Sequence, residues 1–284
     1  MTLKLEIREI QCKSALGKCG FPGGGLAVNP YVGCSHACAY CYARFMKRFT
    51  GHQEEWGSFV DARINIAEVL ARQIKSLKFR GQQIYIGTVT DPYQPMEGKY
   101  KLTRQILEVL NGYDNPVSLL TKSSMVIRDL DILKQFKKVD VNFTINTLDE
   151  KWKRLTEPFS PTIQQRFEAA QKLTRAGIKV FAMMGPYWPI FTDPEKLFKK
   201  FKKAGISRVF TESFNTIGGN WTGVEKVLKK YYPKLLPEFK ETMFNPRKFF
   251  EFYNQAEKKI EELSKKYHLP VTIYFERGHA AKKN

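Results

Sequence analysis

The chain of 284 residues is basic, with 47 Lys and Arg residues against 28 Asp and Glu residues and a net charge of +19. Hydrophobic residues make up 43% of it, and no segment approaches the roughly 18 uninterrupted apolar residues that a membrane span needs. The composition excludes a membrane-spanning protein and predicts a soluble globular one with a sizeable core. The first residues lack the apolar core of a signal peptide, so we expect a cytoplasmic protein with reduced thiols.

Apolar runs rich in β-branched residues predict seven strands, at 26–32, 83–89, 117–121, 141–146, 178–184, 208–213 and 271–275. A helical periodicity covers 102–110, and Ser160, Asp193 and Asn245, each followed by proline, are predicted helix N-caps. This alternation predicts parallel strands with right-handed crossovers. We therefore expect an α/β fold, either an open doubly wound sheet or a partial or full TIM-type barrel. The cysteine loop after the first strand favours the barrel.

Two segments fall outside the alternation of strands and helices. Residues 1–25 are predicted to form an N-terminal extension that ends in three glycines, and residues 26–284 to form the barrel domain. Within that domain, residues 215–246 are polar and rich in Gly, Tyr and Pro, which predicts an irregular surface insertion. An insertion at the rim of a barrel shapes access for the substrate.

Three cysteines within eight residues carry the clearest chemical signal. Cys34, Cys38 and Cys41 form a C-x3-C-x2-C loop. A structural zinc site and an electron-transfer [4Fe-4S] cluster each take four protein ligands, whereas three thiolates leave one iron open. Two alternatives are zinc held by these cysteines with His36, and buried thiols without metal. His36 is two residues from both Cys34 and Cys38, which is a poor spacing for a tetrahedral site.

The residues around this loop resemble a known family. Segment 29–44 is similar to the signature of the spore photoproduct lyase-like, or DNA repair photolyase-like, branch of the radical S-adenosylmethionine (SAM) superfamily. Further motifs follow in the family's order at 90–97, 121–123, Glu157 and Pro158 with Pro161 and Arg166, and Gly185 with Pro186. The resemblance covers residues 10 to 215 and implies the radical SAM type of barrel.

The resemblance implies a [4Fe-4S] cluster on Cys34, Cys38 and Cys41, with the amino and carboxylate groups of SAM chelating the open iron. One electron, from a donor such as ferredoxin or flavodoxin, then cleaves SAM to methionine and a 5′-deoxyadenosyl radical. That radical abstracts a hydrogen atom from the substrate, and this chemistry belongs to the cofactor while the protein positions it.

The resemblance also assigns SAM contacts to four residues. Tyr40 would pack beside the adenine, Lys122 would neutralise the carboxylate, and Thr144 would offer a hydroxyl to the ribose or carboxylate. Gly185 would let the backbone approach the adenine. Lys122, Thr144 and Gly185 each lie toward the carboxyl end of a predicted strand, where barrel enzymes build their active sites. The alternatives are a core aromatic for Tyr40 and a solvated loop lysine for Lys122.

A turn with two prolines after the second predicted strand supplies further candidate catalytic residues. We expect its polar side chains to face SAM or the substrate; they belong to Asp91, Tyr93, Gln94 and Glu97. The alternative is that Asp91 and Pro92 merely begin the following helix. For Arg166, the alternative to a ligand contact is a structural ion pair with Glu157.

One feature departs from the family's pattern. The lyase that names the branch uses a cysteine after the second strand as its hydrogen-atom donor, but residues 87–91 contain no thiol and no cysteine follows Cys41. Repair of spore photoproduct by the same relay is therefore not expected. Cys12 and Cys19 are left as candidates for a redox pair, a hydrogen donor or ligands of a second metal. Their alternative is a structural or incidental role.

The leading hypothesis is a radical SAM enzyme that acts on a nucleic acid, in repair or modification, because excess positive charge is typical of proteins that contact phosphates. A second hypothesis keeps the radical chemistry but takes a protein, peptide or small molecule as substrate. A third is a non-catalytic nucleic-acid-binding protein with a structural zinc.

Overall fold

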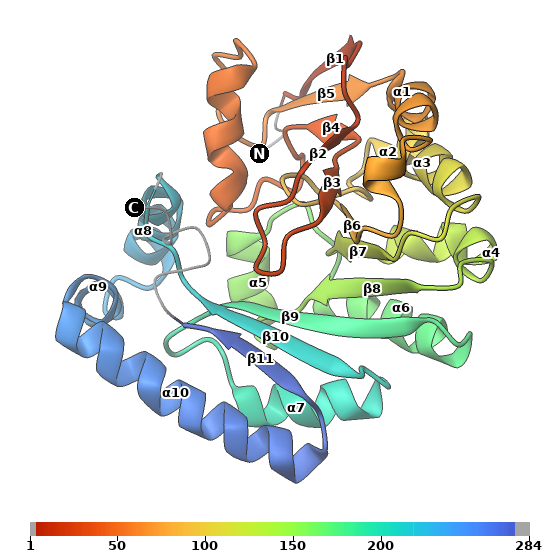
Figure 1. Cartoon of the computed structure of the whole chain (residues 1–284). Helices are drawn as coiled ribbons and strands as arrows, with labels where there is room; N and C mark the ends of the chain where they lie inside the picture. The colour runs from red at the N-terminus through yellow and green to blue at the C-terminus, as the bar shows by residue number, and fades with distance from the viewer. Residues whose placement is uncertain (1–3, 218, 276–284) are drawn as a thin grey trace.

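The computed structural model describes residues 4–217 and 219–275 (Figure 1). Its strands are β1 (Glu6–Ile10), β2 (Leu16–Lys18), β3 (Leu26–Val28), β4 (Tyr31–Val32), β5 (Phe59–Arg63), β6 (Ile84–Ile86), β7 (Val117–Thr121), β8 (Val139–Thr144), β9 (Lys179–Tyr187), β10 (Arg208–Ser213) and β11 (Val271–Tyr274). Its helices are α1 (Ile66–Gln73), α2 (Glu97–Tyr100), α3 (Leu102–Leu110), α4 (Leu130–Leu133), α5 (Glu150–Thr156), α6 (Ile163–Arg175), α7 (Pro194–Lys203), α8 (Asn220–Tyr231), α9 (Leu236–Phe244) and α10 (Pro246–Tyr267). Short 3₁₀ helices are η1 (Tyr42–Phe49), η2 (Leu77–Phe79) and η3 (Ser124–Asp129).

The main sheet has eight strands in the order β11-β10-β9-β8-β7-β6-β3-β2. Every neighbouring pair from β3 to β11 is parallel, and only β2 runs antiparallel to its partner. Within the described part of the chain, the end strands β2 and β11 do not pair with each other, so the curved sheet is an open, partial barrel (Figure 1). The α/β barrel prediction is confirmed, and the partial form is the one observed.

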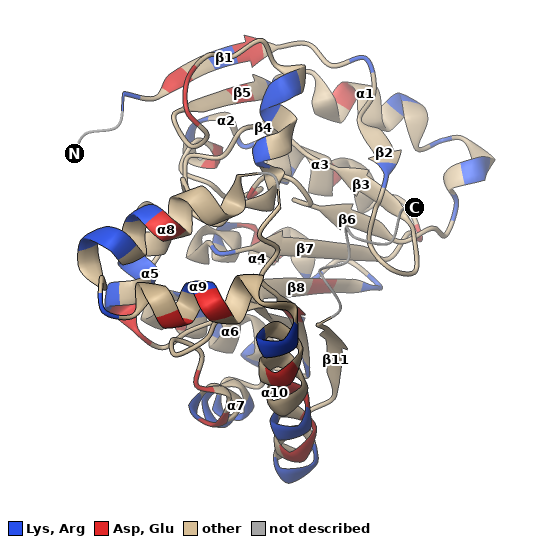
Figure 2. Ribbon diagram, turned by 90° about the vertical axis from the view of Figure 1, so that its left-hand side faces the viewer, with Lys and Arg blue, Asp and Glu red and all other residues tan. Residues whose placement is uncertain are grey.

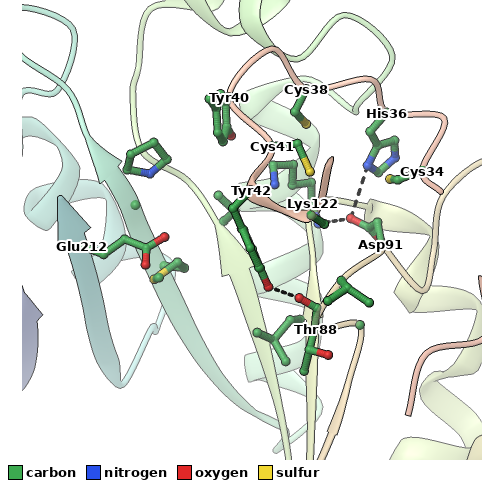
Figure 3. A pocket seen from close by; sticks show the side chains of 18 of the residues that line it. Cys34, His36, Cys38, Tyr40, Cys41, Tyr42, Thr88, Asp91, Lys122 and Glu212 are labelled. Atoms are coloured by element: carbon green, nitrogen blue, oxygen red, sulfur yellow. Dashed lines mark hydrogen bonds and ion pairs between the residues drawn. The ribbon is translucent and has the colours of Figure 1, made fainter. Parts of the chain in front are cut away.

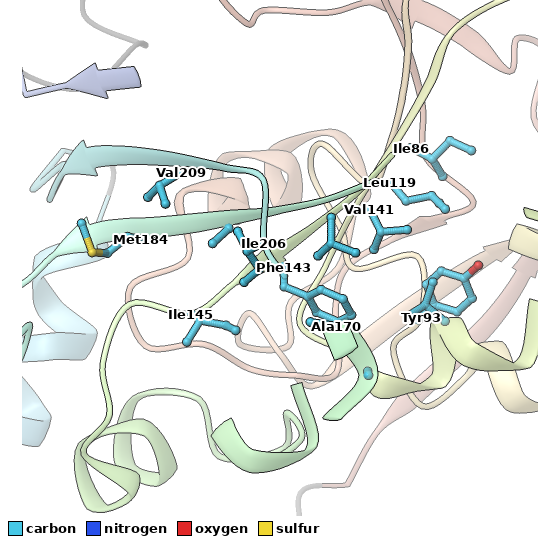
Figure 4. Packing of buried hydrophobic residues seen from close by; sticks show 14 of the residues in the cluster. Ile86, Tyr93, Leu119, Val141, Phe143, Ile145, Ala170, Met184, Ile206 and Val209 are labelled. Atoms are coloured by element: carbon cyan, nitrogen blue, oxygen red, sulfur yellow. The ribbon is translucent and has the colours of Figure 1, made fainter. Parts of the chain in front are cut away.

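Side-chain alternation gives the sheet a hydrophobic outer face and a more polar inner face. On β8, Val141 and Phe143 are fully buried and pack toward the helices, together with Leu119 and Val209 of neighbouring strands (Figure 4). The residues between them on β8 point the opposite way, because successive side chains of a strand alternate. Thr144, which lines the main pocket described below, identifies that opposite face as the interior of the barrel.

The structure changes the prediction at the first strand. Residues 26–32 form two short strands instead of one, because Asn29 and Pro30 interrupt the pairing after β3. β4 leaves the main sheet and joins β5 and β1 in a separate three-stranded sheet. The other six predicted strands are each present, whereas β1, β2 and β5 were not predicted.

Helix boundaries follow their capping chemistry. Asp193 and Asn245 cap α7 and α10 as predicted, each by accepting hydrogen bonds from backbone N–H groups of the first turn. The prediction for Ser160 is wrong. Thr162 caps α6 instead, because its side chain and that of Gln165 form a reciprocal capping box.

The two segments outside the predicted alternation are ordered elements. Within residues 1–25, β1 pairs with β5 and β2 pairs with β3. Residues 215–246 are not irregular, because α8 and α9 occupy most of this segment and each buries an apolar face that includes Val224, Leu228 and Phe239. The polar composition that suggested a loop belongs to the exposed faces of these helices.

Charged side chains gather on the helices. Figure 2 shows Lys and Arg along the outer helices, including α5, α7, α8 and α10, while the strands of the main sheet carry few charges. In the part of the chain that the structure describes, no helix is both long and apolar enough to cross a membrane.

Candidate active site

The cysteine loop follows β4 and is held in place by a tight backbone contact. Gly33 has a φ of +82°, and a Cβ at this position would lie 2.3 Å from the carbonyl oxygen of Phe59. Only glycine fits there without moving the neighbouring strand. The loop is also clamped by Gln94, whose Oε1 accepts the N–H of Ser35 at 2.8 Å and whose Nε2 donates to the carbonyl of Gly33 at 3.3 Å.

The three cysteine side chains lie on one wall of a pocket at the carboxyl ends of the parallel strands (Figure 3). Cys34 and Cys38 are buried, and Cys41 is half-buried. Among the described residues, no three His, Cys, Asp or Glu side chains are arranged to hold a single metal ion. Three cysteines on one pocket wall are the donor set of a [4Fe-4S] cluster with one open iron, whereas a structural zinc site takes four protein ligands.

The pocket brings together eight of the thirteen predicted site residues. Besides the three cysteines, its lining includes Tyr40, Asp91, Lys122, Thr144 and Gly185. Lys122, Thr144 and Gly185 come from the carboxyl ends of β7, β8 and β9, as predicted. Five predicted residues do not line this pocket: Cys12, Cys19, Tyr93, Gln94 and Glu97.

Asp91 connects the turn after β6 to β7 and to the cysteine loop. Its carboxylate accepts hydrogen bonds from the hydroxyl of Thr121 at 2.7 Å and from the backbone N–H of Lys122 at 2.7 Å. Nδ1 of His36 lies 3.3 Å from its Oδ2 (Figure 3). Burial raises the pKa of Asp91, but His36 and these hydrogen bonds more than compensate and lower it to about 2. Asp91 is therefore a carboxylate that holds three segments of the site together.

The expectation that Tyr93, Gln94 and Glu97 face SAM or substrate needs correction. All three side chains are fully buried behind the turn. Glu97 accepts hydrogen bonds from the hydroxyl of Tyr31 at 2.5 Å and from Nη2 of Arg128 at 2.7 Å. Since a buried carboxylate must be paired, these contacts explain its charge without a ligand. The side chain of Gln94 is likewise occupied by partners within the protein, because it hydrogen-bonds the backbone of the cysteine loop.

A buried ion pair lies behind the cysteine wall. The hydroxyl of Tyr40 and Nη2 of Arg166 each donate to a different oxygen of Glu157. Nη1 of Arg166 also donates to the carbonyl of Thr144 at 2.8 Å. Burial raises the pKa of Glu157, but the charges of Arg166 and Lys122 lower it to about 2. Arg166 therefore forms the structural ion pair with Glu157. It also holds Thr144 directly, and Tyr40 through Glu157.

Replacing Glu157 by alanine is expected to lower the free energy of unfolding by about 3–5 kcal/mol, because Arg166 would be left buried without its counter-charge. Urea denaturation of the purified protein would measure this loss. The matched control is Asp114→Ala, which removes the partner of Lys137 in an ion pair that is exposed to solvent and should change stability little. A loss for Glu157→Ala no larger than that of the control would contradict the prediction.

Lys122 is a half-buried cation that lines the same pocket as the cysteines. Its Nζ lies 5.7 Å from the ring centroid of Tyr40. Burial lowers the pKa of Lys122, but negative charge on Cys38 and Glu157 raises it above its ordinary value overall. Lys122 is therefore not a solvated loop lysine, and it presents a fixed positive charge to the pocket.

Tyr42 and Glu212 also line the pocket, although neither was predicted as a site residue. Tyr42 follows Cys41, and its hydroxyl donates to the carbonyl of Thr88 (Figure 3). Glu212 lies near the end of β10 on the wall opposite the cysteines (Figure 3). A Cβ at Gly185 would lie 2.7 Å from Cγ of Glu212, so this glycine makes room for the glutamate. Glu212 shares with Lys122 and Thr144 a position near the carboxyl end of a strand, and that signal in the sequence could have identified it.

The two N-terminal thiols lie apart from the cysteine loop. Cys12 is half-buried beyond β1, where its backbone N–H donates to Oδ1 of Asn65 at 2.8 Å. Cys19 is buried just after β2. Burial raises the pKa of Tyr42 most, and a negative charge on the nearby Cys19 thiol raises it further. Any role in turnover stays a prediction for both, and the geometry favours Cys19 over Cys12.

An open parallel α/β barrel with a pocket at the carboxyl ends of its strands places the protein among the barrel enzymes. The sequence model of the Radical SAM superfamily matches residues 28–195, more than half of the chain, so the protein belongs to this superfamily. It is therefore an enzyme of the kind that uses a [4Fe-4S] cluster and SAM.

Individual relatives agree with this assignment. An uncharacterized protein of Methanocaldococcus jannaschii is 33% identical over 90% of this chain and 93% of its own length. The radical SAM Nα-GlyT isomerase of Pseudomonas phage M6 is 26% identical over 75% of this chain and 45% of its own. A structure of a spore photoproduct lyase mutant with bound AdoMet and dinucleoside spore photoproduct has a TM-score of 0.71 at 17% identity. It covers 95% of this chain and 82% of that one, and this likeness shows a shared fold.

Proposed function

We propose that this radical SAM enzyme holds its cluster on Cys34, Cys38 and Cys41 and repairs or modifies a nucleic acid. The observation that carries the first part is the wall of three cysteines in the same pocket as the half-buried cation of Lys122. When bound, the cluster and SAM supply a one-electron cleavage that yields a 5′-deoxyadenosyl radical able to abstract hydrogen. The chain's own residues orient SAM and keep water out.

Each pocket residue has a defined task in this proposal. Lys122 neutralises the carboxylate of SAM, and Thr144 offers its hydroxyl to the ribose or carboxylate. Tyr40 is fixed by its hydrogen bond to Glu157 and by an edge-to-face contact with Trp188, whose ring centroid lies 5.3 Å from that of Tyr40. Its ring is therefore a rigid surface beside the cofactor. Because the wall behind these residues is buried, the pocket excludes water from a reactive radical.

A nucleic acid is the substrate class that charge and relatives favour. The net charge of +19 gives a sequence-independent attraction to phosphates. One of the similar structures, that of a spore photoproduct lyase mutant, holds a ligand of nucleic-acid chemistry, a dinucleoside spore photoproduct. We also propose a one-electron donor such as ferredoxin or flavodoxin, and a cytoplasmic location.

The test combines binding with turnover. The anaerobically reconstituted protein should bind mixed-sequence DNA or RNA with an affinity that falls steeply as salt rises, since phosphate contacts release counterions. With dithionite and SAM it should form 5′-deoxyadenosine, and the true nucleic-acid substrate should increase that yield. Salt-independent or absent binding to both polymers, with turnover on a peptide or metabolite, would favour the second hypothesis instead. Colourless protein with stoichiometric zinc would favour the third.

A further inference from the structure

The inner face of the barrel continues below the cofactor pocket as a distinct layer of side chains. Leu120, Thr144, Met183 and Glu212 line the pocket itself. One step toward the amino end of the same strands, on the same face, lie Ser118, Asn142, Phe181 and Phe210. Strand register places Asn142 directly between Leu120 and Phe181.

This layer has the chemistry of a site for a flat heterocycle. The rings of Phe181 and Phe210 meet edge to face, with centroids 5.9 Å apart. Both rings and Asn142 are only half-buried, so they border accessible space. Oδ1 of Asn142 is buried without a hydrogen-bond partner. A buried acceptor left unpaired costs free energy, and the N–H group of a bound ligand would satisfy it.

A groove open to solvent adjoins the cofactor pocket. A groove between the two end strands of the open barrel is lined by the β2–β3 loop on one side and by β11 and α10 on the other. Phe21, Phe214 and Asn215 line both this groove and the cofactor pocket. Phe21 also packs against Tyr85, which lies on the inner face of β6, with ring centroids 5.2 Å apart. The groove therefore adjoins the cofactor pocket and the inner face of β6, while register places Asn142 beside the pocket residue Leu120 and Phe210 beside the pocket residue Met183.

We propose that Asn142, Phe181 and Phe210 form the subsite for one unpaired nucleobase, with Oδ1 of Asn142 accepting an N–H of the base edge and the two rings packing on its face. This inference rests on the proposed function and names the part of the nucleic acid that enters the barrel. A base inside a duplex cannot reach this layer, so the substrate must present it unpaired or extruded. Stacking on aromatic rings tolerates every base, whereas the amide selects for a donor.

The experiment measures binding of a short fluorescein-labelled single-stranded DNA, and of the same strand made abasic, to the reconstituted protein by anisotropy. Phe181→Ala should weaken binding of the normal strand roughly tenfold or more, as expected for loss of a stacking contact. Asn142→Leu should weaken it by about three- to tenfold through loss of one hydrogen bond. Neither variant should change binding of the abasic strand, because it lacks the ring that these residues contact.

Three controls keep the result interpretable. Phe181→Tyr retains a ring and should bind like the wild type, and Phe49→Ala removes an aromatic ring that is 66% exposed on η1, far along the chain from β9. Iron content and SAM cleavage without DNA should be unchanged in Asn142→Leu and Phe181→Ala, which shows that both fold. If the wild type binds neither strand, the proposed function fails and this subsite with it. If the wild type binds DNA and both variants bind equally well, the subsite is wrong and the proposed function stands.

Discussion

Replacing Cys34, Cys38 or Cys41 by alanine is expected to reduce the iron of the anaerobically reconstituted protein from about four atoms per chain to near zero. The reason is that the pocket offers only these three thiols. Two remaining thiolates would leave two irons of the cluster without protein ligands. Formation of 5′-deoxyadenosine with dithionite and SAM should be lost together with the iron. Iron assays, visible absorbance and product chromatography on each variant measure both effects.

Cys12→Ala and Cys19→Ala are the matched controls, since they remove thiols that do not line the pocket. Each should keep its full iron content and its substrate-independent cleavage of SAM. Iron retained in Cys38→Ala would contradict the assignment. So would wild-type protein that contains one zinc per chain and no iron.

The elements that the sequence predicted well are those with a strong local signal. Helices α7 and α10 begin at an Asp-Pro and an Asn-Pro pair, whose capping geometry needs no tertiary context. The parallel strands β7 to β10 could be predicted because apolar residues that face the helices recur along each of them, as Val141 and Phe143 do on either side of Asn142 on β8. β1 was missed because it exposes most of its side chains, and β2 and β5 were missed because glycine or charged residues interrupt their short apolar runs.

The site shows where sequence patterns stop being informative. The spacing of the cysteines predicted the cysteine loop, and the family resemblance assigned Lys122 and Thr144, which the structure places in the same pocket. The turn at 91–97 could not be interpreted the same way. A polar residue in a turn looks the same whether it faces a ligand or a buried partner. The cited partners of Gln94 and Glu97 lie 31 to 66 residues away in sequence. Only the folded chain distinguishes the two.

Replacing Lys122 by methionine is expected to weaken SAM binding about ten- to hundredfold, because a hydrogen bond between charged groups contributes about 1.5–3 kcal/mol. The substitution keeps the length of the side chain and removes its charge. Glu157 retains its ion pair with Arg166, so no buried carboxylate is left unpaired and the iron content should stay at the wild-type level. Equilibrium dialysis with labelled SAM, alongside cluster absorbance, separates the two effects.

Lys151→Met is the matched control for this substitution. Lys151 also holds its ammonium above a ring, 5.1 Å from the centroid of Tyr232, but it is exposed on α5 and does not line the cofactor pocket. Loss of a surface cation lowers the net charge by the same amount as loss of Lys122, so a general electrostatic effect on SAM would appear equally in both variants. We expect the control to bind SAM like the wild type. Equal affinities for SAM in Lys122→Met and the wild type would show that the carboxylate of SAM is neutralised by another group.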